Sequence, residues 1–311
     1  MNANERIQAV ERFGFTTRQA GFLVAVMTHS GVCLPRQYAT FAGVAYGHKV
    51  NRFFDRLVAR GLASACPSLH NRAVVYHVRH RGLYQAIGEP HSRFRRPVRA
   101  VATLPRLMAL DAVIGALEVR WLPTAREKAE HFTERLGVPV ECLPSRVTRK
   151  GDGSSRWLFP DALPVGIEGG ERTVIVFPVT PVSLQDFAPF LRRHRALLAV
   201  LPAWALRLVV SPEGRPAQGS WQAVIRREIG SLLDLRDQAE RRVDWHVLPH
   251  RYGHLSPLVD QAHRVRLHVH QGAREGEHWL ARPQPPRRCR ENRRCATRQP
   301  VSVRTAKTAN P

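Results

Sequence analysis

The clearest amphipathic pattern in the chain lies in residues 43–62, GVAYGHKVNRFFDRLVARGL. Apolar side chains recur there at positions i, i+3, i+4, i+7 and i+8, which places them on one stripe of a helix that faces a core. These residues are Val50, Phe53, Phe54, Leu57 and Val58. The opposite face is polar and mostly basic, and Gly61 is placed to end the helix.

Two shorter helical patterns precede this one. The segment Thr16-Thr17-Arg18-Gln19 has the form of a capping box, in which side-chain oxygens of the Thr and the Gln satisfy two free backbone amides at a helix start. Gly31 is placed to stop this helix. A second helix is predicted to begin near Pro35, because proline is favoured in the first turn, and Gly43 interrupts it.

After the third helix the pattern changes to that of a hairpin. Residues 62–66 and 73–78 are rich in apolar and β-branched side chains, and a polar tip, residues 67–72, separates them. A short helix is predicted over residues 81–87. Three helices followed by a hairpin, with a Gly-bearing turn between the second and third helices, is the order of a winged helix-turn-helix. We therefore predict such a domain over residues 1–88.

In this class of domain the exposed face of the third helix enters the major groove of DNA. Side chains near the start of that helix are the candidates for base edges, and other basic side chains are better placed for phosphates. The base-edge candidates are Tyr46, His48, Lys49, Asn51 and Arg52. The remaining candidates for DNA contact are Arg36, Arg56, His70, Asn71 and Arg72. The alternative is an adaptor whose winged helix binds another protein and whose basic residues are merely solvated.

The charge of the chain favours the DNA-binding interpretation. Lys and Arg number 48 against 25 Asp and Glu, which gives a formal net charge of +23. Such an excess favours a polyanionic partner, nucleic acid before a membrane surface. The 5 cysteines are scattered, which indicates a reducing, cytoplasmic setting. No apolar run is long enough to cross a bilayer, so we expect a soluble protein, and no cofactor is predicted.

The second half predicts an α/β domain, which makes the chain α+β overall. Residues 89–103 gather Pro and Arg and are predicted to be a linker, so this domain is placed at residues 104–280. Its predicted elements are helices over 105–119 and 124–136, a hairpin of 157–167 with 172–179, a helix over 184–200, a strand over 205–210, a helix over 220–241 and a strand over 243–248. Residues 281–311 are predicted to be a disordered basic tail.

The order of these elements is similar to that of the restriction-endonuclease-like fold. Pro160-Asp161 precedes the first strand, as the metal-binding Pro-Asp does in that fold. The chemistry also needs a second carboxylate and a lysine on the next strand, but residues 173–180 read TVIVFPVT. Asp161 and Glu118 are therefore only weak metal candidates, and no catalytic residue is predicted. His246, His250 and His254 lie four residues apart, but Pro249 and Gly253 argue against a shared helix face that would bind zinc.

The chain as a whole resembles the replication-relaxation family of plasmids and integrated mobile elements. The resemblance rests on Thr16, Arg18 and Gln19, which match the family's T-x-R-Q start, and on Pro160-Asp161-Ala162, which match its P-D-A segment. It implies a double-stranded DNA-binding protein, with a homodimer as a possible form, that acts in replication, transfer or transcription of a mobile element. The alternative within this resemblance is a Mg²⁺-dependent nuclease or nickase that uses Asp161 and Glu118.

Overall fold

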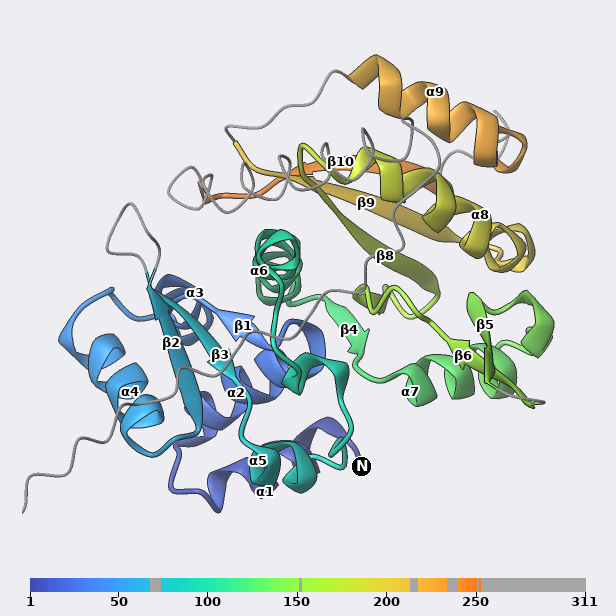
Figure 1. The fold of residues 1–311 in the computed structure, drawn as a ribbon. Helices are drawn as coiled ribbons and strands as arrows, with labels where there is room; N and C mark the ends of the chain where they lie inside the picture. The colour runs from blue at the N-terminus through green and yellow to red at the C-terminus, as the bar shows by residue number, and fades with distance from the viewer. Residues whose placement is uncertain (68–73, 151–152, 213–217, 234–239, 251, 253–311) are drawn as a thin grey trace, which may run out of the picture. The chain divides into compact units, whose positions relative to one another are not determined.

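The computed structural model describes residues 1–67, 74–150, 153–212, 218–233, 240–250 and 252 (Figure 1). The fold is mixed α/β, as predicted, and all of these residues belong to one compact unit.

In the N-terminal part, the described residues form five helices and a small antiparallel sheet. The helices are α1 (Ala3–Glu11), α2 (Thr17–His29), α3 (Pro35–Ala42), α4 (His48–Ala59) and α5 (Arg81–Ala86). The strands are β1 (Val32–Cys33), β2 (Ala63–Pro67) and β3 (Val74–Val78), in the order β1-β3-β2. The predicted helices and hairpin are confirmed, whereas α1 and the two-residue strand β1 were not predicted.

Local sequence signals explain where these helices begin and end. The Thr16 hydroxyl accepts a hydrogen bond from the Gln19 amide at 3.4 Å, and the Gln19 side chain accepts one from the Thr16 amide at 3.3 Å. The predicted capping box is therefore confirmed. Gly43 ends α3 with a φ of +61°, a left-handed conformation that glycine adopts at low cost.

The apolar stripe of α4 is confirmed at four of its five positions. Val50, Phe53, Phe54 and Leu57 are at most 2% exposed. Val58 is 39% exposed, so the prediction that it faces the core is wrong. At about 100° per residue, Val58 lies roughly 80° around the helix from Val50, which places it at the edge of the stripe.

The C-terminal part is built on a five-stranded sheet with the order β10-β9-β8-β7-β4. Strands β8, β9 and β10 run parallel, whereas β7 is antiparallel to both β8 and β4. The strands of this sheet are β4 (Val119–Leu122), β7 (Val165–Glu168), β8 (Arg172–Val179), β9 (Trp204–Val210) and β10 (Arg241–Val247). A separate hairpin pairs β5 (Ser145–Lys150) with β6 (Gly153–Leu158).

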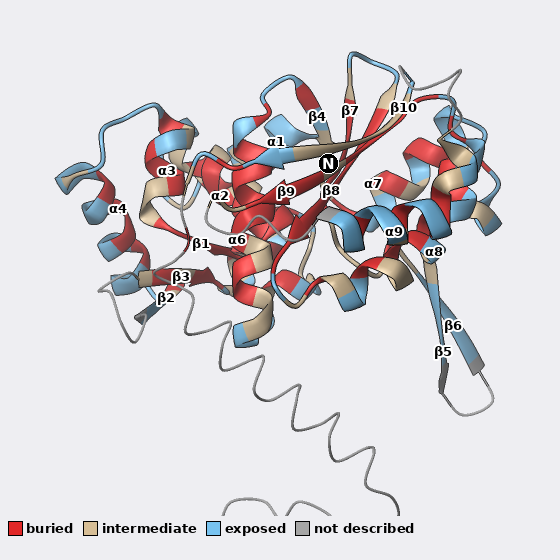
Figure 2. Cartoon of the chain, turned by 90° about the horizontal axis from the view of Figure 1, so that it is seen from above, coloured by how far each residue is buried: buried red, intermediate tan, exposed pale blue. Residues whose placement is uncertain are grey.

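Helices cover both faces of the sheet. Phe177 and Leu208 belong to the core under α8 and α9, whereas Val176 and Val209 face α6. Figure 2 shows β8 and β9 buried along most of their length between these layers. The longer helices are α6 (Ala100–Gly115), α7 (Ala125–Glu130), α8 (Leu184–Val200) and α9 (Gln218–Ile229). The short helical turns are η1 (Arg93–Arg95), the π-helical η2 (His131–Arg135), η3 (Val140–Cys142) and η4 (Gly230–Leu232).

Helix α6 begins at Ala100, inside the predicted linker, and connects the two parts of the fold. Leu110 and Ile114 pack in the core that α2, α3 and α4 share, while Leu107 and Met108 pack with Val176 and Val209 of the sheet. The predicted linker over residues 89–103 therefore overlaps the first turn of α6. The helix predicted over residues 105–119 begins and ends earlier, as α6 over Ala100–Gly115, and Pro105 lies inside it.

Three further predictions in the second half are wrong. Residues 157–167 do not form one strand, because Phe159 and Ala162 have φ values of +49° and +51° that break the extended chain between β6 and β7. Glu118 does not lie on a helix, because α6 ends at Gly115 and Glu118 precedes β4 in a turn. The predicted helix over residues 220–241 ends as α9 at Ile229, followed by η4. The predicted tail, residues 281–311, lies outside the described residues.

Candidate nucleic-acid interface

The face of α4 that points away from the core carries most of the predicted DNA contacts. Tyr46, in the turn before the helix, is 61% exposed. His48, Lys49, Asn51 and Arg52, which form the first turn and a half of α4, lie on its solvent-facing side. The structure therefore brings the five base-edge candidates together on one surface, which we call the α4 face.

The charge of the α4 face is largely uncompensated. Within the described part of the chain, neither Lys49 nor Arg52 forms an ion pair or a side-chain hydrogen bond. Asp55 is the one acidic residue of α4 and lies on the same exposed side. Burial, together with nearby Asp55 and Tyr46, raises the pKa of Tyr76 on β3, which indicates that the α4 face lies beside the hairpin.

Arg56 and Arg60 extend this surface toward the start of α2. The Arg56 guanidinium donates a hydrogen bond to the Gln19 side chain at 2.7 Å and lies 5.3 Å above the Phe15 ring. The Arg60 guanidinium donates to the Phe13 carbonyl at 2.7 Å. Both residues are exposed, so their cations stay at the surface in a fixed position. Arg60 was not predicted, because its contacts with Phe13 and Phe15, which are distant in the sequence, leave no local signal.

Arg36 does not belong to the α4 face. Its guanidinium lies 2.9 Å from the buried carboxylate of Asp111 on α6 and 4.8 Å above the ring of Tyr252. Asp111 also accepts hydrogen bonds from Gln37 and from Tyr252. Arg36 therefore holds α3 to α6, and we remove it from the predicted phosphate contacts. His70, Asn71 and Arg72 lie outside the described residues.

Asp161, the first of the two metal candidates, is engaged by cationic neighbours. The Arg193 guanidinium on α8 forms a two-point ion pair with it, and the Nε atom of Arg193 is 3.2 Å from Oδ2. The Nδ1 atom of His194 lies 3.9 Å from Asp161 and 3.0 Å from the Phe190 carbonyl. Burial lowers the pKa of His194 to about 4, so this ring is neutral at physiological pH and donates to that carbonyl.

Glu118, the second metal candidate, lies at the other end of β7. Its carboxylate is 3.8 Å from Arg207, which also pairs with Glu168 at the end of that strand, whereas Asp161 precedes the first residue of β7. The two acids therefore have different partners and do not form a shared site. Among the residues that the structure describes, no group of three or more His, Cys, Asp or Glu side chains is arranged to hold a metal ion.

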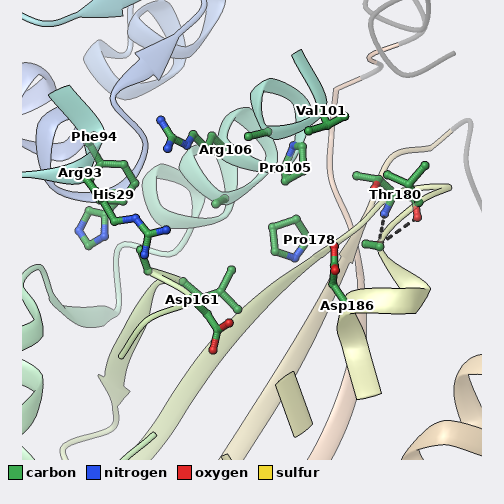
Figure 3. Close-up of a pocket in the computed structure, with 16 residues that line it drawn as sticks. His29, Arg93, Phe94, Val101, Pro105, Arg106, Asp161, Pro178, Thr180 and Asp186 are labelled. Carbon is green, nitrogen blue, oxygen red and sulfur yellow. Dashed lines mark hydrogen bonds between the residues drawn. The ribbon is translucent and has the colours of Figure 1, made fainter. Parts of the chain in front are cut away.

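Asp161 lines a pocket of about 270 Å³ between residues 93–109, the loop before β7 and the start of α8 (Figure 3). Figure 3 shows Arg93 and Arg106 on one side of this pocket and Thr180 and Asp186 on the other. Arg93 and Arg106 were not among the predicted site residues, because Arg93 falls in the predicted linker and Arg106 in a helix that was predicted only for its apolar pattern. The clustering of arginines in residues 93–106 is the signal that could have identified them.

Comparisons of the chain with known protein families, with curated proteins and with solved structures find no match. Over the described residues, none of the helices has the length and apolar character that crossing a bilayer requires.

Proposed function

We propose that residues 1–88 form a winged helix-turn-helix that binds double-stranded DNA, with the α4 face in the major groove. The observation that carries this proposal is the division of α4 into two faces. Its apolar side is buried against α2 and α3, while Lys49, Asn51 and Arg52 are exposed and free of ion pairs with other described residues. Lysine and arginine side chains at these positions can bind phosphates or guanine, and an asparagine side chain can form hydrogen bonds to adenine.

The arrangement of the other elements supports this proposal. Helices α2, α3 and α4 precede the β2–β3 hairpin, and β1 completes a three-stranded antiparallel sheet with it. In winged helices the hairpin lies beside the recognition helix and contacts the DNA backbone. The resemblance to the replication-relaxation family suggests a role in replication, transfer or transcription of a mobile element.

We further propose that the C-terminal part is a restriction-endonuclease-like domain that does not cut DNA. Support for the fold comes from the element order, with antiparallel strands β4, β7 and β8, then helix α8 and the parallel strand β9. Two observations support inactivity. Asp161 forms an ion pair with Arg193, and β8 has neither a carboxylate nor a lysine. A nuclease of this fold needs a second carboxylate to hold Mg²⁺ and a lysine to position the attacking water.

Loss of charge on the α4 face should weaken duplex binding. In a gel-shift titration of duplex DNA from the genes that flank the gene of this protein, we expect the affinity of the Lys49→Ala/Arg52→Ala variant to be at least about tenfold lower than that of the wild type. Its log–log salt slope should also fall by about 2 if both side chains contact phosphates. The matched control is Arg195→Ala/Arg226→Ala, which removes the same charge from exposed positions on α8 and α9.

The control variant should bind duplex DNA nearly as well as the wild-type chain. Equal affinity of wild type and the Lys49/Arg52 variant would contradict the proposal and favour the adaptor, whose winged helix contacts a protein.

The proposal of an inactive nuclease-like domain has its own assay. Supercoiled plasmid incubated with the protein and Mg²⁺ should remain supercoiled, because Asp161 is paired with Arg193 and no group of three or more His, Cys, Asp or Glu side chains among the described residues is arranged to hold the metal ion. Nicking by the wild-type chain that disappears in Asp161→Ala would instead establish the nickase alternative.

A further inference from the structure

A second basic surface lies apart from the α4 face, in a groove of about 730 Å³. Its walls come from the end of α2, residues 89–106, the start of α7 and the hairpin β5–β6 with the loop that follows it. We call it the arginine groove. Its cationic lining residues are Arg93, Arg96, Arg99, Arg106, Lys128 and Arg146. Glu89 is the one carboxylate among the described lining residues.

Nearby acids offset the charge of the arginine groove only in part: among the described residues Asp161 acts on Arg93 and on Lys128, and Glu127 acts on Lys128. None of the six cations forms an ion pair with a described residue, whereas Arg6, Arg172, Arg193 and Arg207 elsewhere in the fold all do. The groove cations that have hydrogen bonds donate them to backbone carbonyls: Arg93 to Pro160, Arg106 to Ser30 and Lys128 to Leu163. Neutral carbonyls leave the positive charge in place, so the groove is a site for an anion.

The titration of the groove side chains agrees with this concentration of charge. Burial, together with nearby Arg93, lowers the pKa of Lys128 to about 7. Burial and the charge of Arg93 also lower the pKa of Arg106. Burial and like charges both destabilise these groups as cations, and an anionic ligand would relieve the repulsion between them.

Trp157 gives the groove an aromatic surface as well. It lies on β6 directly opposite Arg146 of β5, both residues line the groove, and Trp157 is 59% exposed. The other described tryptophans, Trp121, Trp204, Trp221 and Trp245, are buried or half-buried. An exposed tryptophan beside unpaired arginines is the combination that binds nucleic-acid strands, because the ring stacks on a base and the cations hold the phosphates.

We propose that the arginine groove binds a single strand of nucleic acid, as a site separate from the duplex-binding α4 face. Trp157 stacks on a base, and Arg96, Arg99 and Arg146 contact the phosphates. The volume of the groove is that of a pocket for a small molecule, so it encloses a short stretch of one strand and excludes a duplex. An acidic peptide would match the charge, but it would leave the exposed indole without a stacking partner.

The test uses the full chain and a fluorescein-labelled oligothymidylate of about 12 nucleotides, a length within the usual site size for one strand. We expect the anisotropy titration to show an affinity loss of about tenfold for Trp157→Ala and for Arg96→Ala/Arg99→Ala. Trp157→Phe should keep most of the affinity, because phenylalanine still stacks. Unlabelled oligothymidylate should also quench the tryptophan emission of the wild-type chain more than that of Trp157→Phe.

Matched variants separate this site from the α4 face. Lys49→Ala/Arg52→Ala and Arg195→Ala/Arg226→Ala should bind the oligonucleotide as the wild type does. All five variants of this test keep residues 281–311 intact. Wild-type affinity in Trp157→Ala and in Arg96→Ala/Arg99→Ala would overturn the proposal. Displacement of the oligonucleotide by polyglutamate at equal charge concentration, with no effect of Trp157→Ala, would also overturn it and identify an acidic peptide as the ligand. Failure of the α4 face to bind duplex would leave these results unchanged.

Discussion

Single side chains in this fold carry charge that the interior does not compensate, and Lys128 on α7 is the clearest example. Its side chain is 4% exposed, and its Nζ atom donates to the Leu163 carbonyl at 2.7 Å and lies 5.8 Å from the centre of the Phe159 ring. Arg93 faces it with a like charge, whereas Glu127 and Asp161 partly offset the repulsion. With a pKa of about 7, the Lys128 amine is therefore present in both its neutral and its charged form near neutral pH.

This position makes stability depend on pH in a defined window. The pKa of Lys128 falls from 10.5 to about 7 on folding, so between these values the unfolded chain binds more protons than the folded one. The free energy of unfolding should therefore rise with pH through this window, by roughly 2 kcal/mol between about pH 7.5 and 9.5. Urea unfolding at the two pH values measures it.

The control for this prediction replaces the lysine by an apolar residue of similar length. Lys128→Met should remove most of the pH-dependent gain, because the variant has no amine to deprotonate. Lys49→Met, which removes an exposed lysine from α4, serves as the matched variant and should keep the wild-type dependence. An identical pH dependence in Lys128→Met and the wild type would show that Lys128 is not the group responsible.

At the scale of elements, the sequence predicts the helices whose first and last residues are typical of helix ends. Helices α2 and α3 were predictable because Thr16, Gln19, Pro35 and Gly43 mark their boundaries by local chemistry. The interior of α4 was predictable because large apolar residues at helical spacing are typical of one buried helix face. Val58 was placed wrongly because the periodicity shows which side of a helix is buried but not how far the neighbouring core extends.

The elements that were missed depend on contacts distant in the sequence. Strand β4 is four residues long and is defined by its pairing with β7, about 45 residues later in the chain. Its local sequence therefore does not distinguish it from the end of a helix. The hairpin β5–β6 is polar and basic, which locally indicates a loop. The arginine groove was missed for the same reason, because four separated segments form it.

At the scale of the whole molecule, α6 makes the two parts of the described fold interdependent. Ile114 packs in the N-terminal core, whereas Leu107 and Met108 on the same helix pack against the sheet. The buried Gln37 of α3 donates to the Leu107 carbonyl at 2.8 Å and to Asp111 at 2.8 Å, so a polar link accompanies the apolar one. Separation of the two parts would replace these hydrogen bonds by bonds to water, at a net cost of about 0.5–1.5 kcal/mol for each bond.

We therefore expect a single unfolding transition. A substitution in one core should lower the unfolding temperature of both parts. Ile114→Ala should lower the free energy of unfolding by about 2–5 kcal/mol, because it leaves a cavity in the N-terminal core. All 6 tryptophans lie C-terminal to α6, and of the described ones Trp121 contacts His29 of α2, so their fluorescence monitors chiefly the C-terminal part, while far-UV circular dichroism monitors both parts. In Ile114→Ala the two signals should shift to lower temperature together.

The variant Leu117→Ala provides the control, since Leu117 follows α6 and is 87% exposed. Its loss should change either midpoint little, because no buried contact is removed. A domain boundary near residues 89–103, as the sequence predicts, gives a different result. The circular dichroism midpoint of Ile114→Ala would then fall while the tryptophan midpoint stayed at the wild-type value. Such a divergence would mean that α6 packs on both cores without coupling their stability.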